Sequence, residues 1–199
     1  MTPLQVITTA RYLIQDVTPE SGFARQDNAE LLGYFNDGLA EAYAANPALF
    51  QTASTMACTA GTVYQTLSFA NAVRLVEVVG IVGGVSLTPF DRATLDAFNP
   101  GWRNAAAAAA SQYSAAGPGD PLAFFLNAPA PSGQVLDVRF VKKPGTYGLN
   151  DTVLELPESM RPAMVDYVVY RAESKDDEHV LSQRAAGHFS AFLAKIGAK

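Results

Sequence analysis

The strongest constraint on the fold is a change of hydrophobic period along the 199 residues of this chain. Apolar residues recur every three to four positions in residues 1–50 and again in 157–199, which is typical of amphipathic helices. Residues 51–156 are richer in threonine, glycine and short alternating runs, which favour strands. Each terminal helix pair has an apolar face that it cannot bury alone. We therefore predict an α+β single domain over 1–199, in which N- and C-terminal antiparallel helices pack as a helical bundle with a β-hairpin-rich insertion in the middle.

Two helices are predicted before residue 51. Thr2 and Pro3 open the first, because a hydroxyl cap followed by proline is a common helix start. Asp27 and Glu30 have the spacing of a capping box and open the second, which ends at Asn46 because proline disfavours helix in the residue before it. The predicted apolar faces are Val6, Ile7, Ala10, Leu13, Ile14 and Val17, and then Leu31, Leu32, Phe35, Leu39, Ala42 and Tyr43.

The middle of the chain is predicted to be mainly extended. Residues 52–69 indicate short strands, and residues 73–90 a strand or hairpin with glycines at the turn or bulge. Residues 91–98 form a predicted short helix. Residues 122–127 and 133–141 are predicted to pair as an antiparallel hairpin. In the second of these strands the apolar residues Leu136, Val138 and Phe140 alternate with charged ones, which indicates one buried and one wet face.

Two further helices are predicted after residue 156. The first is apolar around most of its circumference and is therefore expected to be largely buried. The second has a continuous apolar stripe and places Arg184 and Lys195 toward its C-terminal end, where the helix dipole favours cations. The stripe consists of Leu181, Ala185, His188, Phe189, Phe192, Leu193 and Ile196.

Composition excludes several classes of protein. The net charge of −5 argues against a nonspecific DNA binder, which needs surplus lysine and arginine to neutralise phosphates. One cysteine, Cys58, cannot form an internal disulfide or a cysteine-rich zinc site. Neither a signal peptide nor a membrane-spanning run is expected from the sequence.

Asp176, Asp177, Glu178 and His179 are the residues that most resemble a catalytic or metal site. They lie between two predicted helices, where acidic side chains cap the next helix and interact with its dipole. Adjacent helical residues point in different directions, and no metal-binding spacing is present. Helix capping is therefore the favoured interpretation, and catalysis, metal binding and cofactors are not expected.

Three other candidate groups also have structural interpretations. His188 lies on an apolar stripe, which favours a core or interface histidine with one satisfied nitrogen. Cys58 is expected to be a buried, inert thiol. Trp102 and Tyr113 could belong to a carbohydrate-binding aromatic platform, although single aromatics more often fill the edge of a core or a subunit contact.

The order of these features resembles the head-to-tail adaptor (connector) proteins of tailed bacteriophages. The similarity is carried by "ARYLIQD", "DNAELLGYFNDGLAEAYAANPALF", "FDRATLDAFNPGW", "FFLNAPAPSGQVLDVRFVKKP" and the stretch from "LELPESM" to "FLAKIG". It covers nearly the whole chain and is strongest over 27–50, 88–102 and 154–197.

The resemblance implies a non-enzymatic virion protein that is made in the host bacterial cytoplasm. It implies a ring, usually of twelve copies, that binds the portal protein, extends the DNA channel and provides a docking surface for tail (nozzle or tail-tube) proteins. Genomic DNA would pass through the lumen without specific binding. The C-terminal segment is the implied contact with the portal or a neighbouring subunit, through Phe192, Lys195, Ile196 and Lys199, although a helix with a basic last turn explains it equally well.

Two other functions remain open at this point. One is another phage tail structural or receptor-binding protein, which would bind tail-tube proteins or host glycans rather than a portal. The other is a small soluble enzyme with a noncontiguous site, which would carry a tightly bound metal or small molecule.

Overall fold

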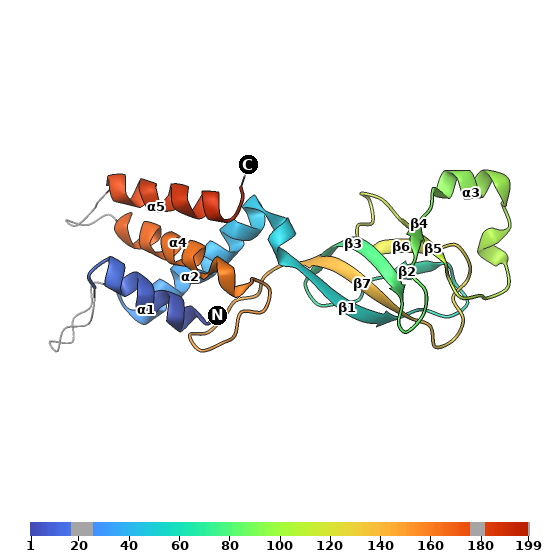
Figure 1. The fold of residues 1–199 in the computed structure, drawn as a ribbon, viewed down its shortest axis with the longest axis horizontal. Coiled ribbons are helices and arrows are strands. Elements are labelled where there is room, and N and C mark those ends of the chain that lie inside the picture. Colours follow the sequence, from blue (N-terminus) through green and yellow to red (C-terminus); the bar gives the residue numbers. More distant parts are fainter. Residues whose placement is uncertain (17–25, 176–181, 199) are drawn as a thin grey trace. The chain divides into compact units, whose positions relative to one another are not determined.

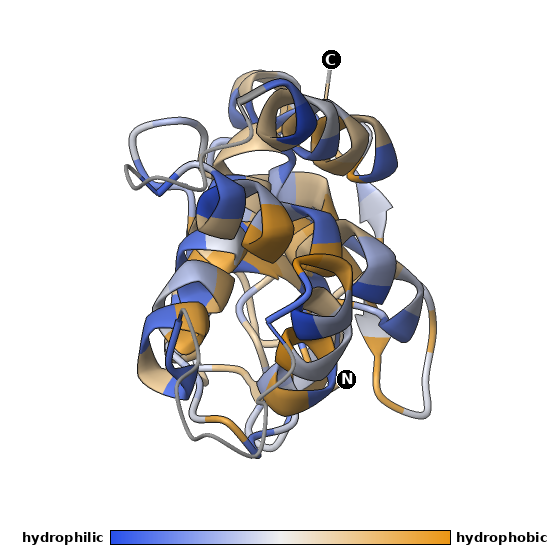
Figure 2. Cartoon of the chain, turned by 90° about the vertical axis from the view of Figure 1, so that its left-hand side faces the viewer, coloured by the Kyte–Doolittle hydropathy of each residue, from blue (hydrophilic) through white to orange (hydrophobic). Residues whose placement is uncertain are grey.

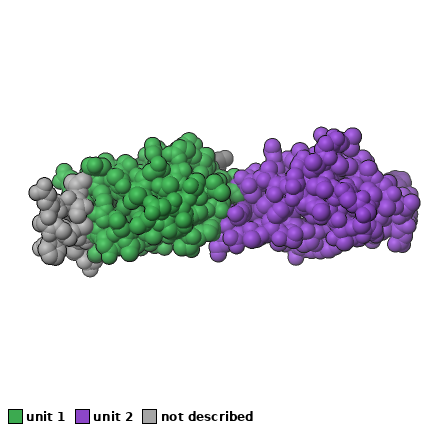
Figure 3. All heavy atoms as spheres, turned by 90° about the horizontal axis from the view of Figure 1, so that it is seen from below, with its two compact units in different colours: residues 1–50, 144–199 green, residues 51–143 purple. Residues whose placement is uncertain are grey.

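The computed structural model describes residues 1–16, 26–175 and 182–198. They form two compact units: unit 1 contains residues 1–50 and 144–199, and unit 2 contains residues 51–143 (Figure 3). The fold is mixed α+β, as the sequence predicts, with four of the described α-helices in unit 1, and with both sheets and the short helix α3 in unit 2 (Figure 1).

Unit 1 is built around one buried helix. Its helices are α1 (Pro3–Leu13), α2 (Asn28–Ala45), α4 (Arg161–Glu173) and α5 (Ser182–Lys195), with 3₁₀ turns η1 (Pro47–Phe50) and η3 (Glu158–Met160). α4 packs against α1, α2 and α5, which confirms the prediction that this helix is largely buried. Hydrophobic and hydrophilic stripes run along these helices (Figure 2), and the hydrophobic ones face inward.

The helix caps of unit 1 largely follow the sequence. Thr2 and Gln5 form a complete capping box, in which the Gln5 N–H donates to Thr2 Oγ1 and the Thr2 N–H donates to Gln5 Oε1. Asp27 caps α2 by accepting from the Glu30 N–H at 2.7 Å. The other half of that predicted box is wrong, because the Glu30 side chain turns to Tyr34 and Lys175 instead. Asn46 ends α2 as predicted.

Unit 2 contains two sheets with different strand orders. The first sheet has the order β1-β7-β3 and the second the order β2-β6-β5-β4. The helical elements α3 and η2 connect β4 to β5. The bounds are β1 (Gln51–Ala57), β2 (Tyr64–Thr66), β3 (Ala72–Ile81), β4 (Thr88–Pro89), α3 (Arg92–Phe98), η2 (Trp102–Asn104), β5 (Gln112–Ala115), β6 (Ala123–Leu126) and β7 (Val135–Lys142).

The predicted hairpin between residues 122–127 and 133–141 is wrong. β6 pairs with β2 and β5, whereas β7 is the central strand of the other sheet and pairs with β1 and β3. The physical reason lies in the two burial patterns. β6 is buried on both of its faces, whereas β7 alternates, so the two strands cannot share one half-buried sheet.

Other predictions for unit 2 are confirmed. Leu136, Val138 and Phe140 of β7 are buried in the core while Arg139 is exposed. After β3 the chain turns back on itself, with Gly83 at φ +70° and the Ile81 N–H donating to the Val85 carbonyl. That left-handed conformation explains a glycine at this turn. Within the described ranges, no helix is long and apolar enough to cross a membrane.

Candidate functional site

Asp176, Asp177, Glu178 and His179 lie outside the described residues. Ser174, which follows the last turn of α4, donates its backbone N–H to the Tyr170 carbonyl at 3.0 Å and thereby ends that helix.

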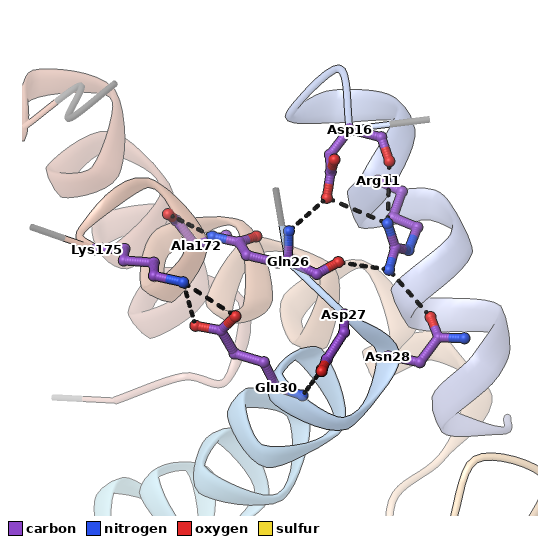
Figure 4. Close-up of polar contacts among 8 residues, drawn as sticks. All are labelled: Arg11, Asp16, Gln26, Asp27, Asn28, Glu30, Ala172 and Lys175. Atoms are coloured by element: carbon purple, nitrogen blue, oxygen red, sulfur yellow. Dashed lines mark hydrogen bonds and ion pairs between the residues drawn. The ribbon is translucent and has the colours of Figure 1, made fainter. Parts of the chain in front are cut away.

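A polar cluster connects the helices at this end of unit 1 (Figure 4). Arg11 on α1 lies at its centre. Nη1 contacts the Asp16 carboxylate at 3.1 Å, and Nη2 donates to the Gln26 carbonyl at 2.7 Å and to Asn28 Oδ1 at 3.1 Å. The Asp16 side chain is only 7% exposed, so its charge is balanced within the protein rather than by water.

The same cluster reaches α4 through two further contacts (Figure 4). Gln26 Nε2 donates to the Ala172 carbonyl at 3.0 Å, and Lys175 Nζ lies 3.0 Å from a Glu30 carboxylate oxygen. Burial acts to raise the pKa of Glu30, but the hydrogen bonds from Tyr34 and Lys175 outweigh it, so this pKa lies below its ordinary value. The cluster therefore fixes the starts and ends of three helices relative to one another.

A second set of charged contacts joins α4 to α5. Asp166 is buried on α4 and interacts with two residues of α5: His188 Nδ1 lies 2.9 Å from Asp166 Oδ1, and Lys195 Nζ donates to Asp166 Oδ2. Nearby, Arg184 of α5 pairs with the buried Glu173 at 3.6 Å. The interpretation of His188 as a histidine with one satisfied ring nitrogen is confirmed.

The structure separates the residues predicted to contact the portal or a neighbouring subunit. Phe192 and Ile196 are 0% and 1% exposed, and the Phe192 ring packs edge-on against Tyr167 at 4.9 Å. Lys195 is exposed except for its contact with Asp166, and Lys199 lies outside the described residues. The apolar pair is thus covered by the protein's own helices, and contact by this segment stays a prediction.

The remaining candidates also have structural roles. Burial raises the pKa of the Cys58 thiol, which disfavours the reactive thiolate. Trp102 and Tyr113 are 1% and 8% exposed, so the carbohydrate platform is wrong and these rings belong to the core. Among the described residues there is no group of three or more His, Cys, Asp or Glu side chains that could hold a metal ion.

Open hollows lie on unit 2. One, of about 330 Å³, is lined mainly by small residues and prolines, with Arg74 and Asp120 at its side. Two others, of about 220 and 270 Å³, flank β1. Sequence reasoning did not find these hollows or the polar cluster, because both depend on residues that only the tertiary fold brings together.

The described residues form an α+β fold with a helical unit and a β-rich unit. Their polar clusters join the helices of unit 1 to one another. The chain belongs to the SU10 adaptor protein family, which it matches over residues 1–199. The predicted relationship to phage head-to-tail adaptors is therefore confirmed, and the protein has a structural role at the head–tail junction of a virion.

The chain was also compared with solved structures and with curated proteins. Among solved structures, a chain described as the neck of an empty GTA (gene transfer agent) particle computed with C6 symmetry is 17% identical and covers 92% of this chain and 87% of that chain. Its TM-score to this chain is 0.32. The curated proteins contain no match.

Proposed function

We propose that the protein forms a ring beneath the portal, binds the portal protein, extends the DNA channel and presents the docking surface for tail proteins. The observation that carries the proposal is the match to the SU10 adaptor protein family across the full 199 residues. The described parts of unit 1 would be the helical bundle of each subunit, and unit 2 the β-rich insertion.

The ring is proposed to contain twelve copies. Large apolar side chains remain exposed in both units, including Tyr12 at 67%, Leu154 at 83% and Phe98 at 86%. Exposed apolar area of this kind is available for contacts between subunits. A head-to-tail arrangement of identical subunits closes into a ring when its rotation allows.

The charge of the chain suits a passive DNA channel. With a net charge of −5 the protein does not supply the cationic surplus that holds phosphates. DNA is therefore proposed to pass through the lumen without specific binding. Neither an enzymatic activity nor a cofactor belongs to the proposal, and synthesis is placed in the host cytoplasm.

The C-terminal helix is the proposed contact with the portal or a neighbouring subunit. Lys195 offers an exposed cation on α5, and Lys199 adds another beyond it. Phe192 and Ile196 would contribute by holding α5 against α4, because their own surface is already buried.

Particle mass tests the proposal. The purified protein is measured by mass photometry alone and after mixing with purified portal protein. A ring that docks on the portal, or a monomer that joins it as a symmetric ring, is the expected result. A monomer or dimer that ignores the portal would overturn the proposal.

A further inference from the structure

β1 has an outer edge that unit 2 leaves open. In the sheet β1-β7-β3, the outer edge of β3 is covered, since the Leu87 N–H donates to the Val79 carbonyl and the Leu75 N–H to the Pro121 carbonyl. All residues of unit 2 are described, and within this unit no backbone hydrogen bond reaches the outer edge of β1. The outer strands of the second sheet, β2 and β4, have only three and two residues, whereas β1 has seven.

The hydrogen bonds of β7 show which groups of β1 point outward. The Cys58 N–H donates to the Gln134 carbonyl next to β1, and the Lys143 N–H donates to the Asn71 carbonyl next to β3. Even-numbered residues of β7 therefore bond toward β1 and odd-numbered ones toward β3, since backbone groups alternate along an antiparallel strand. By the register of the pair, the residues of β1 whose backbone N–H and C=O face away from β7 are Gln51, Ala53, Thr55 and Ala57.

β1 also lacks the usual protection of an open edge. Natural sheets protect such edges with charged side chains, prolines, bulges or very short strands. The sequence QTASTMA contains neither a charge nor a proline, and its pairing with β7 runs through seven residues without a register shift. An open edge of this kind is a template for another strand.

The two hollows beside β1 would receive the side chains of an added strand. One, of about 270 Å³, includes Phe69 and Phe140, whose rings stack at 4.7 Å, and has Lys142 in its lining. The other, of about 220 Å³, includes Ala53 and Arg139, whose exposed guanidinium lies 3.8 Å from the Glu77 carboxylate and can also meet a further acidic group. Because Phe140 and Arg139 are consecutive on β7, their side chains point to opposite faces of the sheet. Successive side chains of an added strand also alternate between the two faces, so one would meet aromatic rings and the next a guanidinium.

We propose that β1 accepts an extended segment of another virion protein as a fourth strand, with an apolar side chain directed toward Phe140 and an acidic one toward Arg139. The backbone supplies the affinity and the two hollows supply the selectivity, as in other cases of strand addition. This proposal rests on the proposed function, which places such proteins next to the ring. A second copy of this chain fits less well, because its one long open edge in unit 2 is β1 itself, which has no acidic side chain for Arg139.

Amide hydrogen exchange, resolved by residue, tests the proposal on the free protein and on the protein in purified phage particles. In the free protein, we expect the amides of Thr52, Ser54 and Met56, which face β7, to exchange slowly and those of Ala53 and Thr55 to exchange fast. In the particle, we expect exchange at Ala53 and Thr55 to slow by about 100-fold, as for amides that enter a stable ladder.

A pair of proline variants tests the same edge. Ala53→Pro removes an outward N–H of β1 and should exclude the protein from particles or lower its incorporation at least tenfold. Thr66→Pro is the matched control: the Leu67 N–H and the Val63 carbonyl bond to β6, so the N–H of Thr66 points outward from the short strand β2. It should be incorporated normally. Fluorescence of Trp102, buried in unit 2, verifies that both variants fold.

Each other outcome overturns the proposal in a distinct way. If the protein docks on the portal but Ala53 and Thr55 still exchange fast in the particle, the strand addition is wrong and the adaptor function stands. If the free protein dimerises and those amides are already protected, the occupant is a second copy. If the protein is absent from the head–tail junction, both proposals fail.

Discussion

Unit 1 and unit 2 differ in the polar side chains that they bury. Unit 1 buries charged side chains, including Asp16, Asp166 and Glu173, and each is paired with a cation from another helix or from its own helix end. In unit 2 the buried polar side chains are two amides, Gln65 and Gln134, and the core is otherwise apolar.

This difference suggests that unit 1 holds its helices in a fixed arrangement, whereas unit 2 offers a strand edge for binding. Buried ion pairs require specific geometry, and removing one partner leaves a costly charge. They therefore favour one arrangement of the helices of unit 1. Gln65, by contrast, bonds only to nearby loop backbone at Thr59 and Thr62, so the sheets of unit 2 depend on apolar packing and backbone ladders. Such a unit can offer a strand edge without disturbing its core.

Truncation of the two cores should have the largest effect. Phe35→Ala in unit 1 and Phe124→Ala in unit 2 each remove a side chain that is 0% exposed, and each should cost its unit about 4 kcal/mol. Helix circular dichroism follows mainly unit 1, and fluorescence of Trp102, the sole tryptophan, follows unit 2.

The two variants should not behave alike. The two ends of unit 2 lie together in its sheet, because Gln51 pairs with Val141, so we expect this unit to fold without unit 1. We expect unit 1 to be less stable when unit 2 is unfolded, since closing a long unfolded connection between Phe50 and Pro144 costs loop entropy. Phe124→Ala should therefore lower both signals and Phe35→Ala only the helical one. Equal loss of both signals in both variants would instead support the single cooperative domain predicted from the sequence.

Removal of one cation should show the next largest effect. Arg11→Leu should destabilise unit 1 by about 3 kcal/mol, because it takes the guanidinium from the buried Asp16 carboxylate. Arg139→Leu is the matched change in unit 2, where the pair with Glu77 spans 3.8 Å and both side chains are exposed, so the loss should stay below about 0.5 kcal/mol. Urea unfolding measures both, and similar losses would remove the contrast between the units.

The helices were largely predictable from the sequence because their signals are local. The Thr2 cap, the end of α2 at Asn46 and the apolar face of α4 each depend on residues within a few positions. The family relationship was also predictable, because the features that carry it extend over nearly the whole chain, as does the match to the family.

The strand pairing and the polar cluster were not predictable for a physical reason. β6 and β7 are neighbours in sequence, but their partners lie up to 90 residues away, at β1 in one case. Which strands pair depends on burial of both faces, and short apolar runs such as "AFFL" do not reveal that. Arg11 likewise meets Gln26 and Asn28 only because α1 and α2 pack together.

Substitution of two glycines of α2 should change the stability of unit 1 by an intermediate amount. At Gly38 a Cβ would lie 2.7 Å from Tyr167 Cδ1 and 3.0 Å from Met164 Cε, so Gly38→Ala should cost about 2 kcal/mol by overpacking. Gly33 on the same helix has open space around it, and Gly33→Ala should stabilise by about 1 kcal/mol through helix propensity. Thermal unfolding compares them. A stabilising Gly38→Ala would show that α4 can move away from α2.

The smallest expected effect concerns acid stability. The pKa of Glu30 lies below its ordinary value, with burial opposing and the Tyr34 and Lys175 hydrogen bonds favouring the ionised form. A carboxylate with a depressed folded-state pKa contributes stability above its unfolded pKa, and this is lost as pH falls through the folded pKa. Glu30→Gln should therefore cost less than about 1 kcal/mol at pH 7, and the difference from wild type should shrink toward zero as the pH falls below the ordinary pKa of glutamate and through the lower pKa of the folded state. Glu41→Gln, an exposed change on the same helix, is the control, and urea midpoints from pH 7 to pH 2 measure the trend. If the Glu30→Gln difference stayed constant across this range, the ion pair between Glu30 and Lys175 would contribute nothing to the packing of α2 on α4. The ion pairs that hold the helices of unit 1 together would then be those of Arg11 and of α5.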